Sequence, residues 1–287
     1  MKKTLPIPWW AKIGAKIILS RLPFGYKIWQ HLGLFRHGSM DSSTYAISVF
    51  RSHVARAGMT EGLAGRTILE LGPGDSIATA ILAKAHGARA ILVDAGSYAR
   101  QDTRPYAELE IELQKMMGGC SILEGASSVP DILSICNAAY LTEGLASLRS
   151  LESASVDMIF SQAVLEHVRR SEFIDTMKQC RRILRPDGVC SHRVDLKDHL
   201  QESLNNLRFS TGVWESKLFA RSGFYTNRIR YSQMLEIFWE AGFKVDVLEV
   251  CRWEHLPIAR KDLAEEFRNI PDDELCVSGF DVRMYCV

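Results

Sequence analysis

Short apolar runs alternate with amphipathic stretches along most of this chain. The first run, at 67–71, enters a turn that contains Gly72 and Gly74, and the second, at 90–93, ends on Asp94. The stretch between them has the apolar spacing of a helix. A strand, a glycine turn, a helix, a second strand and an acid form the layout of a nucleotide-binding βαβ unit. The pattern therefore predicts a nucleotide-like cofactor at this turn.

The same alternation continues to the end of the chain. Five further strands are expected, at 138–142, 156–160, 188–194, 243–250 and 280–287, and helices are expected at 41–64, 77–86, 105–117, 173–184, 231–241 and 259–268. Strands that alternate with helices in this way predict an α/β fold, with one mostly parallel sheet covered by helices on both faces.

Two regions depart from this pattern and suggest how the chain is divided. Residues 1–64 begin with basic and aromatic positions, and residues 195–230 are polar and aromatic without clean periodicity. We therefore expect an N-terminal helical segment over 1–64 and a main domain over 65–287. The region at about 195–230 is expected to be an insertion in that main domain.

The N-terminal segment carries an unusual charge pattern. Residues 1–40 contain seven Lys or Arg and no Asp or Glu, interleaved with tryptophan and isoleucine. Lys12 and Lys16 lie four apart, on one side of a possible helix, as in segments that bind an anionic membrane surface. Frequent proline and glycine favour the other interpretation, a helix that packs on the main domain or covers its active site. Peripheral membrane contact through residues 1–36 remains the alternative.

Composition excludes several classes of protein. The net charge is +1, so no overall field attracts nucleic acid. The seven cysteines are scattered without a Cys-x-x-Cys pair, which argues against a structural zinc site and a disulfide framework. No apolar run approaches the roughly 20 residues that span a bilayer, and no secretory signal is evident. A cytoplasmic protein is expected, peripheral at the membrane in the alternative.

Two later segments narrow the choice of cofactor. Residues 155–168 read Ser-Val-Asp-Met-Ile-Phe-Ser-Gln-Ala-Val-Leu-Glu-His-Val, and residues 182–189 read Arg-Ile-Leu-Arg-Pro-Asp-Gly-Val. Ile77 stands where nicotinamide and flavin sites have a third glycine, which counts against those cofactors. Together with the Glu-x-Gly-x-Gly turn and the acid after the second strand, these segments resemble the class I S-adenosylmethionine-dependent methyltransferases, and the type 11 group in particular. The resemblance covers about 66–194.

This resemblance implies a Rossmann-like class I methyltransferase fold, with a seven-stranded, mostly parallel sheet and an antiparallel final strand. It also implies S-adenosyl-L-methionine as the cofactor. Cofactor-binding roles carry over to Glu70, Gly72, Gly74, Asp94, Glu143, Ser161 and Gln162. The glycines would pack against the methionine moiety and Asp94 would hold the ribose, while Glu143 is a looser match near adenine. The last two positions line the cofactor and the methyl-transfer cleft.

A hydroxyl acceptor would need a base near the methyl group to take its proton. His167, just after the fourth strand, and His192, in the fifth, are the candidates, with Asp195 as an orienting carboxylate. The last two, with Asp198 and His199, lie at the carboxyl end of a strand, where open α/β sheets bind ligands. This cluster also suits a divalent ion, but nothing else in the sequence requires a metal. A structural histidine and a solvated loop are the plainer alternatives.

The insertion is rich in Asn, Arg, Trp and Tyr, which stack on rings and bond to hydroxyl groups. This composition is typical of a substrate cap that recognises a sugar or glycan precursor, although an ordinary connection would also fit. The expected function is O-methylation of a hydroxylated small molecule or glycan precursor. The alternatives are a methyltransferase that acts on a membrane lipid or quinone, and a non-catalytic binding module with the same fold.

Overall fold

The computed structural model describes residues 8–19, 40, 42–118 and 121–287. The prediction of membrane contact through residues 1–36 therefore lies largely outside the described residues, and only the segment 8–19 can be placed.

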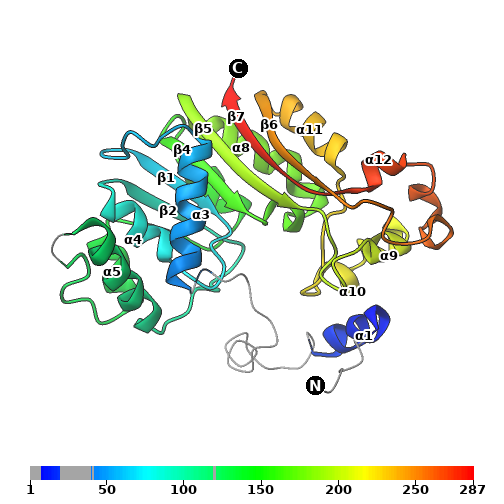
Figure 1. The fold of residues 1–287 in the computed structure, drawn as a ribbon, viewed down its shortest axis with the longest axis horizontal. Coiled ribbons are helices and arrows are strands. Elements are labelled where there is room, and N and C mark those ends of the chain that lie inside the picture. The colour runs from blue at the N-terminus through cyan, green and yellow to red at the C-terminus, as the bar shows by residue number, and fades with distance from the viewer. Residues whose placement is uncertain (1–7, 20–39, 41, 119–120) are drawn as a thin grey trace.

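A seven-stranded sheet runs through the middle of the molecule, with strand order β3-β2-β1-β4-β5-β7-β6 (Figure 1). The strands are β1 (Thr67–Leu71), β2 (Arg89–Val93), β3 (Ala139–Leu141), β4 (Val156–Gln162), β5 (Leu184–Asp195), β6 (Phe243–Arg252) and β7 (Val277–Cys286). β1 to β5 pair in parallel, whereas β7 is antiparallel to both β5 and β6. The predicted α/β fold with an antiparallel final strand is confirmed.

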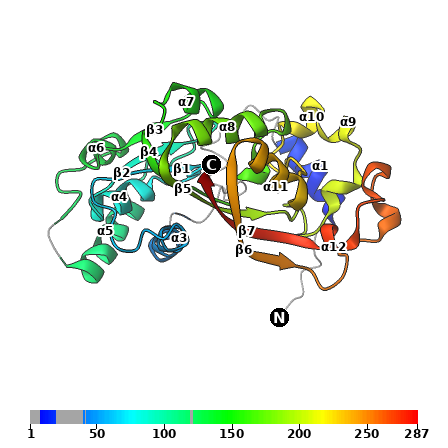
Figure 2. The same ribbon diagram turned by 90° about the horizontal axis from the view of Figure 1, so that it is seen from above.

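Helices cover both faces of the sheet, as Figure 2 shows from above. One face carries α3 (Ser43–Arg56), α4 (Ala78–Ala85), α5 (Arg104–Met117) and α6 (Val129–Ile135), and the other carries α7 (Leu145–Ser150), α8 (Phe173–Ile183) and α11 (Tyr231–Glu240). Successive strand residues alternate between the two cores: Ile68 lies in the first and Leu69 in the second. This alternation follows from the period of two along a strand, and it explains why the strands read as continuous apolar runs.

Helix α3 belongs to the main core, although the sequence grouped it with the N-terminal segment. Ala46 and Phe50 on its inner face are almost fully buried. The Phe50 ring meets Phe160 of β4 with 6.3 Å between centroids. The helix ends at Arg56, earlier than expected.

The expected helix at 259–268 is wrong. Two 3₁₀ turns, Arg260–Asp262 and Glu265–Phe267, stand there instead. The Ala264 N–H donates to Leu207 O at 2.9 Å, so this backbone is bonded to the insertion and not to a helical turn. Helix α6, at 129–135, is too short to show a clear period and was not predicted.

The insertion folds around its own small core. It contains a 3₁₀ turn (Asn205–Arg208), α9 (Thr211–Trp214) and α10 (Lys217–Ala220). Trp214 is completely buried, and its indole N–H donates to Thr226 O at 2.7 Å. Phe224 and Tyr225 are buried in the same cluster.

Several polar residues of the insertion are likewise turned inward. Asn206 donates to the Thr226 hydroxyl, and Arg228 donates to Phe209 O at 2.6 Å. Arg230 is buried and donates to Val277 O at 2.7 Å. The predicted ring-stacking surface is therefore wrong for these side chains, because they satisfy one another inside the insertion instead of facing a ligand.

An N-terminal helix, α1 (Trp9–Leu19), packs on this insertion. Ile13 is buried in the same cluster as Trp214, and Lys12 donates to Leu200 O at 2.6 Å. Packing of an N-terminal helix on the main domain, the interpretation favoured from the sequence, is confirmed for the described residues. None of the helices that the structure describes is long and apolar enough to cross a membrane.

Replacing Trp214 with alanine should destabilise the insertion strongly. The change removes a fully buried ring and leaves Thr226 O without its donor, so we expect the free energy of unfolding to fall by about 3–5 kcal/mol in chemical denaturation. The exposed neighbour gives the control: Val213→Ala should change it by about 0.5 kcal/mol or less. Equal effects of the two variants would contradict the description of this core.

Candidate active site

The glycine turn lies at the carboxyl end of β1 and is joined to β2 by backbone bonds. Gly72 and Gly74 have φ values of +66° and +64°, in a region that residues other than glycine rarely adopt. The Gly72 N–H donates to Val93 O at 2.8 Å, and the Gly74 N–H donates to Asp94 Oδ2 at 2.9 Å. The turn and the acid after β2, which the sequence predicted to act together, are thus in direct contact.

Asp94 is held in a defined orientation. Its Oδ1 accepts from the Ala95 N–H at 2.7 Å, and its carbonyl accepts from the Gly144 N–H at 2.8 Å. Burial raises the pKa of Asp94 to about 6, against the opposing effect of the two backbone N–H donors. Each carboxylate oxygen uses one acceptor position and keeps another, as an oxygen that binds ribose hydroxyls requires.

Glu70 lies under the turn, in β1, and is almost completely buried. Burial, together with the nearby charge of Asp94, raises the pKa of Glu70 to about 8. This carboxyl group is therefore mainly protonated at neutral pH. Only one of these two neighbouring acids is then charged, which avoids a close pair of negative charges beneath the glycine turn.

Residues after β3 complete this corner of the site. The Glu143 N–H donates to the Ser147 hydroxyl at 2.9 Å, and the adjacent Gly144 bonds to Asp94. The Glu143 side chain itself is exposed. The structure therefore brings Glu143, the loosely aligned position, beside Asp94 at the same edge of the sheet.

Ser161 and Gln162, at the end of β4, face different partners. Ser161 is buried, and its hydroxyl lies 2.8 Å from His192 Nδ1. Gln162 is half-buried, and its Oε1 lies 3.1 Å from Nε2 of His53. Nδ1 of the same histidine lies 2.8 Å from the Ser191 hydroxyl. His53, on α3, was missed in the sequence because a polar position on a helix gives no sign that it points inward.

The geometry argues against His192 as a general base. The side chain is fully buried, and its Nε2 has no partner among the described residues. Burial, with a smaller effect of His53, lowers the pKa of His192 to about 3. An imidazole with a pKa this low does not hold a proton near neutral pH, so His192 is poorly suited to act as a general base.

His167 is arranged differently. It ends a 3₁₀ turn (Leu165–His167) after β4, and its Nδ1 lies 2.9 Å from Tyr225 O. Because a carbonyl only accepts, Nδ1 carries the hydrogen, and the basic lone pair of the neutral ring is on Nε2. That Nε2 lies 2.9 Å from Nε2 of His199, and the two rings stack with 4.7 Å between centroids.

Asp195 and Asp198, the two acids of the predicted cluster, bond to different partners. Asp195 accepts from the Lys197 N–H at 2.9 Å, and its carboxylate pairs with the Lys197 ammonium at 3.5 Å. Asp198 is buried and accepts from the Asn205 N–H at 2.6 Å. Asp195 is thus engaged with lysine in this structure and not with either candidate base. Over the described ranges, no group of three or more His, Cys, Asp or Glu is placed to hold a metal ion.

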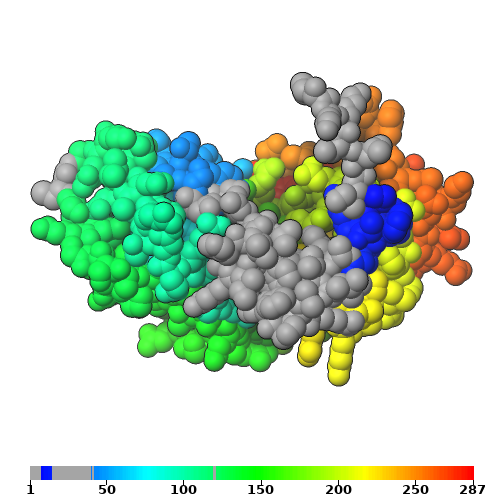
Figure 3. Space-filling view, turned by 90° about the horizontal axis from the view of Figure 1, so that it is seen from below, coloured from blue at the N-terminus to red at the C-terminus, as the bar shows by residue number. Residues whose placement is uncertain are grey.

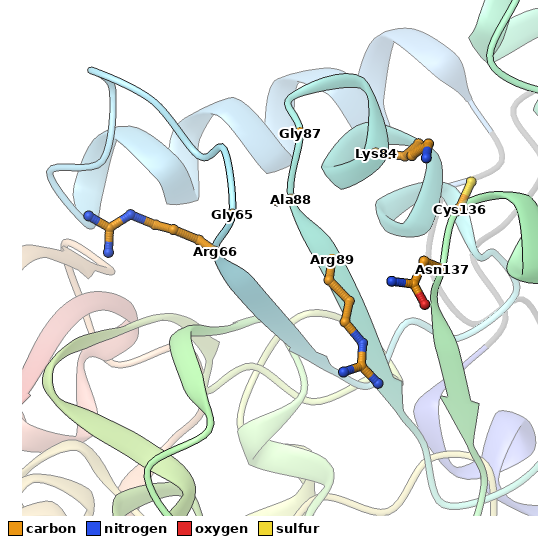
Figure 4. Close-up of a pocket in the computed structure, with 8 residues that line it drawn as sticks. All are labelled: Gly65, Arg66, Lys84, Gly87, Ala88, Arg89, Cys136 and Asn137. Atoms are coloured by element: carbon orange, nitrogen blue, oxygen red, sulfur yellow. The ribbon is translucent and has the colours of Figure 1, made fainter.

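A cavity of about 310 Å³ lies elsewhere, at the amino ends of β1 and β2 (Figure 4). Arg66, Lys84 and Arg89 line it, but Figure 4 shows that their side chains point in different directions. Because the glycine turn and Asp94 are at the opposite ends of these strands, this cavity is separate from the cofactor corner.

A known family matches most of this architecture. The family model described as a methyltransferase domain matches residues 44–248, which includes α3 and all the motifs discussed above. The chain belongs to this methyltransferase family. No curated protein matches the sequence. S-adenosyl-L-methionine is accordingly the cofactor, and the sheet has the strands that the class I resemblance implied, with the last one antiparallel.

The solved structures that resemble this one are distant in sequence. An S-adenosylmethionine-dependent methyltransferase from Methanosarcina mazei is 14% identical, with 83% of this chain and 97% of that chain covered and a TM-score of 0.47. One from Archaeoglobus fulgidus is 12% identical, covering 85% and 93%, with a TM-score of 0.45. One from Mesorhizobium loti is 16% identical, covering 80% and 95%, with a TM-score of 0.44.

Replacing Gly72 with alanine should weaken both folding and cofactor binding. An added Cβ would lie 2.6 Å from both methyl carbons of Val164. In addition, a residue with a Cβ at φ of +66° loses roughly 1–2 kcal/mol of folding free energy. We expect a lower melting temperature and weaker binding of S-adenosylhomocysteine in calorimetry. Adding Val164→Ala should restore the part due to the clash and leave the backbone strain. If the double variant were no better than the single one, the contact with Val164 would not be the cause.

Replacing Glu70 with glutamine should flatten the dependence of stability on pH. The folded-state pKa of Glu70, about 8, lies above the ordinary value of 4.5. The stabilising contribution of this group is therefore complete below pH 4.5 and is lost as the pH rises through 8. Denaturation of the wild type should therefore show a larger loss of unfolding free energy over this window than the variant shows. The exposed Glu152→Gln should behave as the wild type does. Parallel curves for wild type and Glu70→Gln would contradict a protonated Glu70.

Proposed function

We propose that this protein methylates a hydroxyl group of a small hydroxylated molecule or glycan precursor, with His167 as the proton acceptor. The carrying observation is the bond between His167 Nδ1 and Tyr225 O, which fixes the tautomer so that the basic lone pair lies on Nε2. A base with a fixed tautomer at the edge of a methyltransferase cleft suits an acceptor that must lose a proton.

When bound, S-adenosylmethionine would supply a methyl group on a positively charged sulfur for in-line transfer to the acceptor atom. Three parts of the chain would cooperate in this reaction. Gly72, Gly74 and Asp94 would hold the cofactor, with Glu143 beside its adenine end. Gln162 would face the cleft in the orientation that His53 gives its amide.

His199 contributes to the same proton acceptor. In the neutral pair, its Nε2–H donates to the His167 lone pair, because His167 already carries its own hydrogen on Nδ1. His167 can take the proton only when the acceptor hydroxyl displaces the His199 N–H from Nε2, so that the proton passes to this Nε2 while the acceptor oxygen forms its bond to the methyl carbon. Asp195 lies near this edge of the sheet but is engaged with Lys197, so it is not assigned a part in the proton transfer.

His167→Gln should lower methyl transfer without affecting cofactor binding. Transfer to a panel of sugars and glycan precursors would be followed by release of S-adenosylhomocysteine. For the acceptor that reacts, kcat should fall by about 10²- to 10⁴-fold, because the general base is lost. The affinity for S-adenosylhomocysteine should stay unchanged, because His167 is not among the residues proposed to hold the cofactor.

The control is His86→Gln. His86 also bonds through Nδ1 to a backbone carbonyl, that of Leu82 at 2.8 Å, but it caps α4 away from the cleft. Its replacement should leave kcat unchanged. An unchanged kcat in His167→Gln would remove the proposed base, and transfer only to thiols or amines would contradict the choice of a hydroxyl acceptor.

A further inference from the structure

The surface formed by α1, α9 and α10 exposes apolar side chains. Trp10 is 64% exposed, Val213 44% and Leu218 37%, although the neighbouring aromatic residues are buried. Seen from below, α1 in blue lies beside the yellow segment that contains α9 and α10 (Figure 3). We call Trp10, Val213, Lys217, Leu218 and Arg221 the docking face.

The charge of this surface is positive. Among the exposed residues of 210–223, Lys217 and Arg221 are the charged ones, and none is acidic. Because the net charge of the whole chain is only +1, this positive charge is local. Residues 1–40, which precede and include α1, have seven basic residues and no acidic one by sequence. Exposed tryptophan beside Lys and Arg is the combination that binds the interface of an anionic membrane.

The boundary of the face is defined on one side. Thr211 at the start of α9 donates through its N–H to Glu266 Oε1 at 2.7 Å, and Glu265 and Glu266 are exposed. Lys261, Asp262 and Arg268 of the same segment are exposed as well, so beyond Thr211 the surface carries both charges and the excess of positive charge ends there. The side with α1 and α10 is therefore the one that an anionic membrane would attract.

Helix α1 is attached firmly enough to present Trp10. Its Trp9 ring meets Phe209 at 6.0 Å between centroids, and Arg208 lies over the same ring at 5.2 Å. Ile13 is buried, and Lys12 donates to Leu200 O. The inner side of the helix is thus used for packing, and Trp10 remains on the outer side.

The docking face is linked to the proposed base by short contacts. Glu215 of the α9–α10 segment accepts from the Tyr225 hydroxyl at 3.0 Å, and Tyr225 O is the partner of His167. On the other side, Lys12 of α1 bonds to Leu200, the residue after His199. The elements that would meet the membrane therefore contact Tyr225 and Leu200, which bond to His167 and follow His199 in sequence, respectively.

From these observations we infer that the protein docks peripherally on an anionic lipid surface through this face, and that its acceptor is a hydroxylated molecule taken from that surface. The docking rests on the geometry and charge of the face alone. The identity of the acceptor rests in addition on the proposed function.

Vesicle flotation of the full chain tests the docking. The probes are vesicles of phosphatidylcholine and vesicles of phosphatidylcholine mixed with phosphatidylglycerol. We expect binding only to the anionic vesicles, weakened by salt. Lys217→Gln with Arg221→Gln should reduce it on the order of 25-fold, about fivefold for each cation removed. Trp10→Ala should reduce it by about tenfold.

Two surface variants provide matched controls. Trp239, on α11, is 55% exposed, and Lys244, on β6, is exposed as well, but neither is near α1. Trp239→Ala and Lys244→Gln should bind vesicles as the wild type does. All variants should bind S-adenosylhomocysteine normally, which separates a loss of docking from a loss of the cofactor site.

Three outcomes would overturn the inference. These are equal binding to neutral and anionic vesicles, equal loss in the docking-face and control variants, or no vesicle binding accompanied by self-association that depends on Trp10. The last result would assign the face to a second copy of the chain. Failure of S-adenosylhomocysteine binding with intact vesicle binding would instead contradict the proposed function and leave the docking in place.

Discussion

The hydrogen bond between the Gly74 N–H and Asp94 Oδ2 is the interaction on which the rest of the site depends. It joins the turn after β1 to the acid after β2, and it requires the left-handed backbone that glycine allows at both turn positions. Parallel strands bring their carboxyl ends to one edge, so the ends of β3, β4 and β5 meet this pair. Because these strand ends meet at one edge of the sheet, the glycine turn with Asp94 and the histidine pair both lie at that edge.

Burial has placed several ionisable groups around this edge in their neutral forms. Glu70 has a pKa raised to about 8 by burial, and His53 has a pKa lowered to about 3 for the same reason. A neutral His53 bonds to Gln162 on one side and Ser191 on the other, and so orients the amide without adding charge. Asp94, with a pKa of about 6, stays mainly charged at neutral pH, and this favours a ligand that donates hydrogen bonds.

The sequence predicted the sheet well because strand and helix periods are local properties. The alternation at β1, β2 and β4, and the glycines of the first turn, each specify their own element and point to the same fold. The prediction from sequence failed for the insertion, because composition alone does not indicate in which direction a side chain points. Trp214 and Arg228 have the chemistry of a sugar-binding surface, but they bond to Thr226 and Phe209 inside the insertion.

The candidate site shows the same division. Gly74 and Asp94 were predicted together because the motif places them, and the structure brings them within hydrogen-bond distance. The pairing of His167 with His199 joins two segments 32 positions apart, and no local pattern indicates it. His192 was chosen for its place at a strand end, but the alternation of the strand turns it into the core.

The central claim is that Asp94 and the glycine turn form the cofactor corner of a methyltransferase. Calorimetric titration of S-adenosylhomocysteine into the wild type and into Asp94→Asn tests it most directly, at a pH above the Asp94 pKa of about 6. We predict saturable binding to the wild type and an affinity lower by roughly 10- to 100-fold in the variant, because a charged hydrogen-bond acceptor is lost. Equal affinities in two well-folded proteins would contradict the assignment of this corner.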